Sequence, residues 1–386
     1  MTAGHLAGSA AASPIPFVDL AGQRARIADR IDAAIHRVLE HGAFIMGPEV
    51  DDLETRLAAF CGARHAITCA SGTDALLLVL MAKGIGRGDA VFMPTFSFPA
   101  PAEAAALLGA TPVFVDVLPE TFNLDHQSLQ AAVESVERQG RLRARAVIPV
   151  DLYGHPAAYP AVRRVAEDHG MVVVADAAQS FGARLAGERV GTLADVTVTS
   201  FYPAKPLGCY GDGGCVFTQD DELAATIRSL RLHGQGRDRN DFVRIGINGR
   251  LDTLQAAILI EKLAIFEDEL AARKRIAEHY GERLRGVAKA PAAAPDAQPA
   301  WGYYTLVLER RDEVAARLQA QGIPTAVYYP KTLHRQPAYR AFAPDTIVAP
   351  VAERLAESVL SLPMHPYLDT ATQDRIVGAV IAALST

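Results

Sequence analysis

Lys205 stands in an irregular stretch of the chain where a reactive amine can be held in place. The surrounding sequence reads TSFYPAKPLGCYGDGGCVFT. Pro203 and Pro206 flank the lysine, and because proline fixes its own φ and disfavours helix in the residue before it, Lys205 joins no regular element. Apolar runs on either side, Val196 to Phe201 and Cys215 to Phe217, predict strands that position this loop. An amine so placed suits Schiff-base chemistry with an aldehyde.

Two further groups at predicted strand ends could serve such chemistry. Asp176 ends an apolar run and is followed by small residues, so a flat ring could approach its carboxylate; the alternative is a simple helix cap. Ser71-Gly72-Thr73 connects a short strand to an apolar helix, which offers backbone N–H groups to an anion, although many helix caps look alike. A lone lysine is usually solvated, but lysine, carboxylate and anion turn together predict a pyridoxal phosphate (PLP) site.

Composition restricts the classes of protein to consider. The chain has 386 residues, half of them hydrophobic, and a net charge of 38 − 44 = −6 without a basic cluster. Nucleic acid and anionic membranes are therefore poor candidate partners, and no apolar run is long enough to span a bilayer. The four cysteines show no CxxC spacing, which argues against a disulfide framework or a zinc site and fits a reducing cytoplasm.

The elements that must position these residues alternate along the chain. Continuous apolar strands are expected at 66–69, 90–93, 113–116, 146–150 and 171–175, with a helix between each strand and the next. Such a pattern predicts an α/β fold with a mainly parallel sheet covered on both faces, and ligands of such sheets bind at the carboxyl ends of strands. That edge would gather residues 71–73, Thr95 to Phe98 and Asp176.

The chain divides into three parts by composition. Residues 1–14 are mostly small and uncharged and predict a disordered tail. Residues 15–265 form the predicted large domain, which begins with helices at 22–40 and 49–60. Residues 266–386 form a smaller α+β domain, entered through a helical stretch at 252–286. Within it we expect strands at 303–308 and 325–329, and helices at 312–321 and after residue 370.

The ordered set of motifs resembles fold-type I PLP enzymes, specifically the nucleotide-sugar aminotransferases of the DegT/DnrJ/StrS type. The similar stretches are IPFVDL (15–20), GPEVDDLE (47–54), SGTDAL (71–76), PVFVDV (112–117), DAAQSFGA (176–183), SFYPAKPLGCYGDGG (200–214), GINGRLDTLQAAIL (246–259) and LSLPMHPYL (360–368). They follow the family's order over nearly the whole chain after residue 15. The resemblance implies an aspartate-aminotransferase-like large domain and a smaller C-terminal domain.

The resemblance also implies roles for individual residues. Lys205 would carry the cofactor and shuttle the proton. The implied cofactor contacts are Asp176 with the pyridine nitrogen, Gln179 with the ring's 3-oxygen, Gly72, Thr73 and Ser200 with the phosphate, and Phe98 with the ring face. Asn248 would reach the phosphate across an interface, which implies a homodimer with two shared sites. Without the family, Phe98 would be a core aromatic and Asn248 a turn residue.

The substrate is implied by the same comparison. In family members that act on uronic-acid sugars, an arginine at position 250 and a His-Tyr pair recognise the substrate carboxylate. Here Arg250 is present, Tyr329 matches, and Tyr328 replaces the histidine. Arg250 could instead cap a helix or pair with Asp252. The implied reaction moves an amine from glutamate to a keto-sugar nucleotide, chiefly UDP-2-acetamido-2-deoxy-3-oxo-glucuronate. The alternatives are a 3- or 4-keto-6-deoxy sugar on dTDP or UDP, or a non-catalytic PLP-binding regulator.

Overall fold

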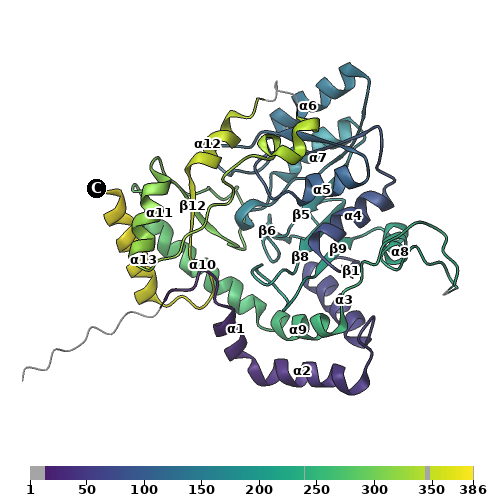
Figure 1. Cartoon of the computed structure of the whole chain (residues 1–386), viewed down its shortest axis with the longest axis horizontal. Helices are drawn as coiled ribbons and strands as arrows, with labels where there is room; N and C mark the ends of the chain where they lie inside the picture. The colour runs from purple at the N-terminus through teal and green to yellow at the C-terminus, as the bar shows by residue number, and fades with distance from the viewer. Residues whose placement is uncertain (1–13, 239, 344–347, 386) are drawn as a thin grey trace, which may run out of the picture.

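The protein is represented by a computed structural model that describes residues 14–238, 240–343 and 348–385 (Figure 1). The predicted disordered tail, residues 1–14, therefore lies outside the described residues except for Pro14. A seven-stranded sheet runs through the larger part of the molecule in the order β1-β9-β8-β5-β4-β2-β3. Its strands are β1 (His65–Cys69), β2 (Asp89–Pro94), β3 (Thr111–Val115), β4 (Arg143–Val147), β5 (Val172–Asp176), β8 (Val196–Ser200) and β9 (Gly214–Thr218).

The sheet is mainly parallel, as predicted. Only β9 runs against its two neighbours, β1 and β8, whereas β8, β5, β4, β2 and β3 are parallel to one another. Since side chains alternate along a strand, Val91 and Met93 face one hydrophobic cluster while Ala90 and Phe92 face another. Both faces of the sheet are therefore buried, which explains the continuous apolar runs of the sequence.

Helices cover both faces of this sheet. On one face lie α4 (Gly72–Ala82), α5 (Ala100–Leu107) and α8 (Asp221–Leu230). On the other face lie α6 (His126–Gln139) and α7 (Tyr159–Asp168). Helix α3 (Pro48–Cys61) and helix α9 (Thr253–Leu263) cover the β1–β9 end of the sheet through a cluster that contains Phe217. The helix predicted for each strand connection is thus present.

Two long predicted helices are each broken in the structure. The helix expected at 22–40 is divided into α1 (Leu20–Arg26) and α2 (Ala28–His41) at Ile27. The stretch 252–286 is divided into α9 and α10 (Phe266–Arg283), with Ile265 at the break. Ile27 and Ile265 are buried in the same hydrophobic cluster, so the two breaks lie at one buried site. The hydrophobic periodicity of each segment does not reveal this shared burial.

The C-terminal part has its own core. Strands β11 (Tyr304–Val307) and β12 (Val359–Leu362) pair antiparallel, and they pack with helices α11 (Arg311–Ala320) and α13 (Thr370–Leu384). Helix α12 (Pro350–Ser358) precedes β12, and small strands form a separate sheet: β6 (Arg184–Leu185), β7 (Glu188–Arg189) and β10 (Ala297–Gln298). Helix α10 joins both cores, because Phe266 packs in one and Tyr280 in the other. The division at residue 265 stays a prediction.

The strand predicted at 325–329 is wrong. Only Ala326 forms a bridge, to Ser361 of β12. Beyond Ala326 the chain leaves the sheet because the rings of Tyr328 and Tyr329 pack against other aromatic residues, Tyr328 against Tyr303 at a centroid distance of 4.6 Å. Within the described residues, no helix is both long enough and apolar enough to cross a bilayer.

Candidate active site

Lys205 lies in a tight turn at the carboxyl end of β8. The N–H of Lys205 donates to the carbonyl of Tyr202 at 2.8 Å, and Cys209 N–H donates to the carbonyl of Phe201 at 2.8 Å. Gly208 fits this turn because a Cβ there would stand 2.5 Å from the Pro203 carbonyl oxygen. The lysine is therefore held by a closed backbone turn, as the flanking prolines predict.

Asp176 ends β5, the parallel neighbour of β8, and it interacts electrostatically with Lys205. Burial raises the pKa of Asp176, while the N–H of Ala178, 3.0 Å from Oδ1, and the charge of Lys205 oppose that rise. Burial lowers the pKa of Lys205, and the charge of Asp176 offsets part of that effect. The lysine thus releases a proton more readily than a surface lysine, beside a carboxylate that depends on its neighbours for its charge.

The amide of Gln179 is oriented by its surroundings. Its Oε1 accepts a hydrogen bond from the backbone N–H of Tyr153 at 2.7 Å. A backbone N–H can only donate, so the oxygen must face Tyr153 and the amide nitrogen must face the other way. Nε2 lies 3.3 Å from the hydroxyl of Tyr329, and it carries a second N–H. Gln179 therefore presents a donor, which suits an acceptor such as a phenolate oxygen.

The turn at residues 71–73 has the geometry of an anion cradle. Ser71 is the N-cap of α4, and its Oγ accepts from the N–H of Asp74 at 3.0 Å. Gly72 and Thr73 are the first residues of the helix, where N–H groups have no partner within the helix. Gly72 lies against Ser200 at the end of β8. Three residues predicted to hold a phosphate thus come together from two elements.

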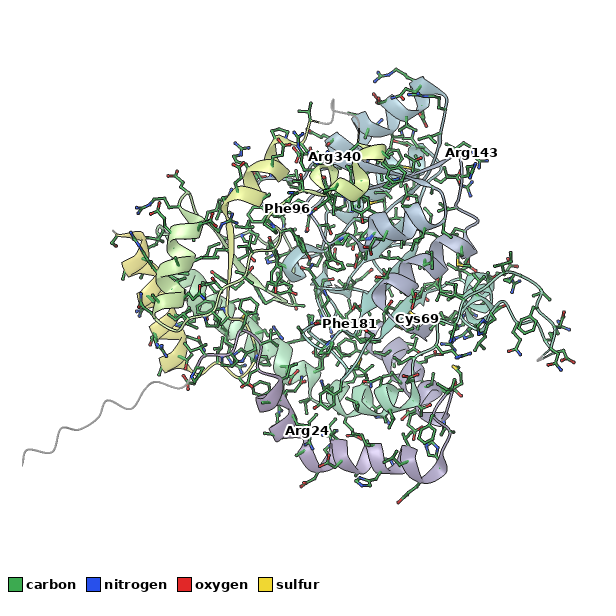
Figure 2. All side chains as sticks on the ribbon, viewed as in Figure 1. Arg24, Cys69, Phe96, Arg143, Phe181 and Arg340 are labelled. Carbon is green, nitrogen blue, oxygen red and sulfur yellow. The ribbon has the colours of Figure 1, made fainter. Side chains whose placement is uncertain are left out.

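An aromatic wall lies beside these groups. Phe98, 52% exposed, follows β2, and its ring is tilted against Tyr329 at 6.3 Å. Phe96, also beyond β2, meets Tyr329 edge-on at 6.4 Å, and Figure 2 shows it within the body of the molecule. The hydroxyl of Tyr329 contacts Gln179, and the ring of Tyr328 packs against the ring of Tyr303 in the same aromatic cluster. Phe98 has the exposure that a ring-stacking residue needs, in contrast to the buried Phe96.

Asn248 and Arg250 lie in a different pocket. They line a cavity of about 430 Å³ with Gly211, Asp212 and Gln255. Among the described residues, no hydrogen bond or ion pair joins either side chain to Lys205 or Asp176, and Arg250 makes no ion pair with Asp252. Nε of Arg250 is buried without a hydrogen-bond partner in the described part of the chain, so this donor is not used within it. The structure places these two residues beside the turn at residues 71–73, because the N–H of Ala70 donates to the carbonyl of Gly249.

The donor set fits PLP. A buried carboxylate stands at one strand end, a helix N-terminus with a glycine at another, and an amine of lowered pKa between them.

Sequence reasoning missed Tyr153, whose N–H orients Gln179. The signal was its place in DLYGHP, just after the predicted strand 146–150, at the same edge of the sheet.

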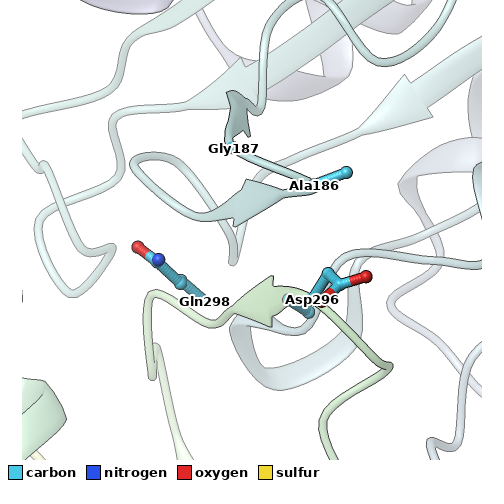
Figure 3. Close-up of a pocket in the computed structure, with 5 residues that line it drawn as sticks. Ala186, Gly187, Asp296 and Gln298 are labelled. Carbon is cyan, nitrogen blue, oxygen red and sulfur yellow. The ribbon is translucent and has the colours of Figure 1, made fainter.

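A larger cavity of about 540 Å³ lies elsewhere, between the β6–β7 hairpin and β10 (Figure 3). It is lined by Ala186, Gly187, Asp296, Ala297 and Gln298, none of them predicted for the site. It offers one carboxylate and one amide, without a basic or nucleophilic side chain. The chemistry is therefore concentrated at the carboxyl ends of β5 and β8.

Comparison with known proteins gives consistent matches over nearly the whole chain. The model of the DegT/DnrJ/EryC1/StrS aminotransferase family matches residues 25–381. UDP-2-acetamido-2-deoxy-3-oxo-D-glucuronate aminotransferase of Pseudomonas aeruginosa is 50% identical over 367 residues, which cover 95% of this chain and 99% of that protein. dTDP-3-amino-3,4,6-trideoxy-alpha-D-glucose transaminase of Streptomyces venezuelae is 42% identical over 368 residues, 95% of each chain.

Solved structures agree with the fold. A DegT DnrJ EryC1 StrS aminotransferase from Brucella abortus superposes with a TM-score of 0.94 at 50% identity, covering 96% of this chain and all of that one (100%). NtdA from Bacillus subtilis, solved with bound cofactor PMP, superposes with a TM-score of 0.85 at 28% identity, covering 93% of this chain and 82% of that one.

Proposed function

The chain belongs to the DegT/DnrJ/EryC1/StrS aminotransferase family, and we propose that it transfers the amino group of glutamate to UDP-2-acetamido-2-deoxy-3-oxo-glucuronate. Family members of this kind are PLP-dependent aminotransferases that act on sugar nucleotides. The observation that carries the choice of sugar is the 50% identity to the Pseudomonas enzyme over 95% of the chain. Arg250, with an unpartnered Nε, supplies a cation suited to the uronate carboxylate.

The residues of the site divide the work between them. When bound, PLP supplies an electron sink for charge that develops on the carbon next to an amine. Lys205 then accepts and returns a proton at Nζ, a task for which its lowered pKa prepares it. Asp176 would hold the ring nitrogen, Gln179 would donate from Nε2 to the ring oxygen, and residues 72, 73 and 200 would hold the phosphate. Phe98 would cover one ring face.

A second sugar class has a specific observation in its favour. Tyr328 stands where uronate-specific relatives are expected to carry histidine. A phenol of raised pKa donates a neutral hydrogen bond, and it does not add positive charge for a carboxylate. The 42% identity to the Streptomyces transaminase keeps dTDP-linked 6-deoxy keto-sugars as the alternative.

The test uses the holoenzyme with glutamate and each of the two sugar nucleotides. We expect a yellow protein whose cofactor band bleaches when glutamate is added, and release of 2-oxoglutarate with the uronate at the higher kcat/KM. Lys205→Ala should lose both the band and turnover. If only the dTDP sugar were turned over, the alternative substrate would replace the uronate. A cofactor band without turnover of either sugar would favour a non-catalytic PLP-binding regulator.

A homodimer is part of the proposal. Asn248 and Arg250 follow the loop after α8, which projects from the body at the right of Figure 1 and exposes Phe242, Val243 and Ile245, the last at 90%. Apolar side chains so exposed suit burial against a second copy. Light scattering should give twice the chain mass, and Ile245→Asp should shift the measured mass toward that of the monomer.

A cytoplasmic location is also proposed, supported by four free cysteines.

A further inference from the structure

Tyr153 contacts three separate segments through its three polar groups. Its side chain is fully buried, at 0% exposure. The backbone N–H donates to Oε1 of Gln179 at 2.7 Å, and the carbonyl accepts from the N–H of Tyr303 at 3.3 Å. The hydroxyl donates to the carbonyl of Tyr328. Burial raises the pKa of Tyr153, so the hydroxyl keeps its proton and remains a donor.

The backbone at Tyr153 is held in an unusual conformation. Its φ of 59° and ψ of 9° lie in the left-handed region, which side-chain-bearing residues rarely adopt. The turn is fixed by the buried carboxylate of Asp151, which accepts from the hydroxyls of Tyr159 at 2.7 Å and Ser180 at 2.6 Å. Ser180 follows Gln179, so the same carboxylate ties the Tyr153 turn to the Gln179 turn. Such strain persists only where the surroundings enforce it.

We propose that Tyr153 is a positioning residue that couples the cofactor side of the site to the substrate side. Its N–H orients the amide of Gln179, and its hydroxyl anchors the backbone that carries Tyr328 and Tyr329. The two sides come from different parts of the chain, residues 176–181 and 325–330, and Tyr329 returns to Gln179 to close the circuit. The assignment of sides to cofactor and sugar rests on the proposed function; the coupling itself does not.

The hydroxyl has a distinct task within this circuit. Beyond Ala326, which bridges to Ser361, the segment leaves the β11–β12 sheet. Its position then depends on aromatic packing, of Tyr328 with Tyr303 and of Tyr329 with Phe96 and Phe98. It also depends on two hydrogen bonds, one between Tyr329 and Gln179 and one from Tyr153 to the carbonyl of Tyr328. Ring packing leaves the backbone freer to slide than a directed hydrogen bond does. Loss of the hydroxyl should therefore loosen residues 326–329 and leave Gln179 oriented, because the backbone N–H remains.

The chain offers a matched control for this experiment. Tyr280 is also fully buried, and its hydroxyl donates to a backbone carbonyl, that of Pro363, at 3.1 Å in the C-terminal core. Tyr280→Phe therefore removes the same kind of hydrogen bond as Tyr153→Phe at a place that joins no two sides of the site. Both variants are prepared as holoenzymes. Amide hydrogen exchange of the peptide spanning 325–332, the cofactor spectrum, and KM and kcat are measured for each.

For Tyr153→Phe we expect exchange at 326–329 and the KM for the sugar nucleotide each to rise about tenfold, while kcat and bleaching by glutamate stay within about twofold. Tyr280→Phe should change none of these quantities. Unchanged exchange in Tyr153→Phe, or an equal rise in Tyr280→Phe, would overturn the coupling. The exchange measurement needs no sugar, so it decides the coupling even if neither sugar nucleotide is turned over and the proposed function fails.

Discussion

A Cβ added to Gly72 would stand 2.8 Å from the Cβ of Ser200. The first residue of α4 therefore meets the last residue of β8 at a distance that only glycine permits. This contact brings the N-terminus of the helix to the strand that leads into the Lys205 turn. The predicted phosphate cradle and the predicted Schiff-base lysine are thus positioned by one backbone approach.

Replacement of Gly72 by alanine should weaken cofactor binding. The added methyl group must push α4 away from Ser200, which moves the N–H groups of residues 72 and 73. We expect the Kd of the apoprotein for PLP to rise by about tenfold or more, measured by absorbance titration. Gly378→Ala is the control, because nothing lies within 4 Å of that position in α13. It should leave the Kd unchanged and add up to about 1 kcal/mol of stability. Equal Kd values for wild type and Gly72→Ala would contradict the cradle.

Lys262 predicts a pH dependence of stability. This lysine of α9 is 0% exposed, its Nζ donates to the carbonyl of Gly208 at 2.6 Å, and burial lowers its pKa from 10.5 to about 8. Between pH 8 and 10.5 the unfolded chain then holds more protons than the folded protein, so the free energy of unfolding rises with pH. The slope from this group reaches up to about 1.4 kcal/mol per pH unit.

The comparison of wild type with Lys262→Met isolates that contribution, because other titrating groups are shared. Denaturant unfolding at pH 7, 8, 9 and 10 should show the wild type gaining stability relative to the variant from pH 8 upward. Methionine also loses the hydrogen bond to Gly208 and the contact with the ring of Tyr210 at 4.1 Å. This loss lowers the variant's free energy of unfolding at every pH and does not produce a slope. A stability difference that stays constant with pH would refute a depressed pKa for Lys262.

Much of the fold was predictable because hydrophobic patterning is a local property. Continuous apolar runs gave the parallel sheet, and strand ends gave Asp176 and the 71–73 turn. Two kinds of feature were not local. Ile27 and Ile265 stand at the breaks of two predicted helices and are buried in one cluster, and Tyr328 packs against Tyr303 instead of extending a strand. Both features involve contacts between distant segments, and the hydrophobic periodicity of a single segment carries no information about such contacts.

The candidate site was predictable to a different extent. Lys205, between two prolines, and Asp176, at a strand end, could be predicted from their residue types and their places in the sequence. Tyr153 does not, because its importance lies in a backbone N–H that any residue carries and in a left-handed conformation that favours glycine or asparagine. The separate pocket of Asn248 and Arg250 also could not be derived from one chain's residue order, since the resemblance places Asn248 in the site of a partner.

Glu54 and Arg231 form a buried ion pair beside β1. Nη1 of Arg231 lies 2.5 Å from Oε1 of Glu54, and Thr68 of β1 donates to the same oxygen from its N–H and its hydroxyl at 2.9 Å. Glu54→Gln keeps the shape but leaves the buried guanidinium without its counter-charge. We expect a loss of about 3–5 kcal/mol in denaturant unfolding.

A surface pair on the same helix provides the control for Glu54. Asp52 and Arg56 form an i,i+4 ion pair at 2.8 Å, with side chains about half exposed (47% and 51%). Asp52→Asn should cost less than about 1 kcal/mol because water screens the pair. If the two substitutions cost the same, burial does not set the strength of the Glu54–Arg231 pair.

Arg250 should decide between a uronate and a neutral sugar. Its Nε is buried without a partner in the described chain, and its pocket also holds Asn248 and Gln255. Hydrogen bonds from a guanidinium to a carboxylate contribute about 1.5–3 kcal/mol, so Arg250→Gln should lower kcat/KM for the UDP-linked uronate by about 10- to 150-fold. The same variant should lower kcat/KM for a neutral keto-sugar nucleotide by less than about threefold. Arg250→Lys keeps the charge but not the fork, and it should recover only part of the loss. An equal loss with both sugars would mean that Arg250 supports the fold or the dimer rather than the substrate carboxylate.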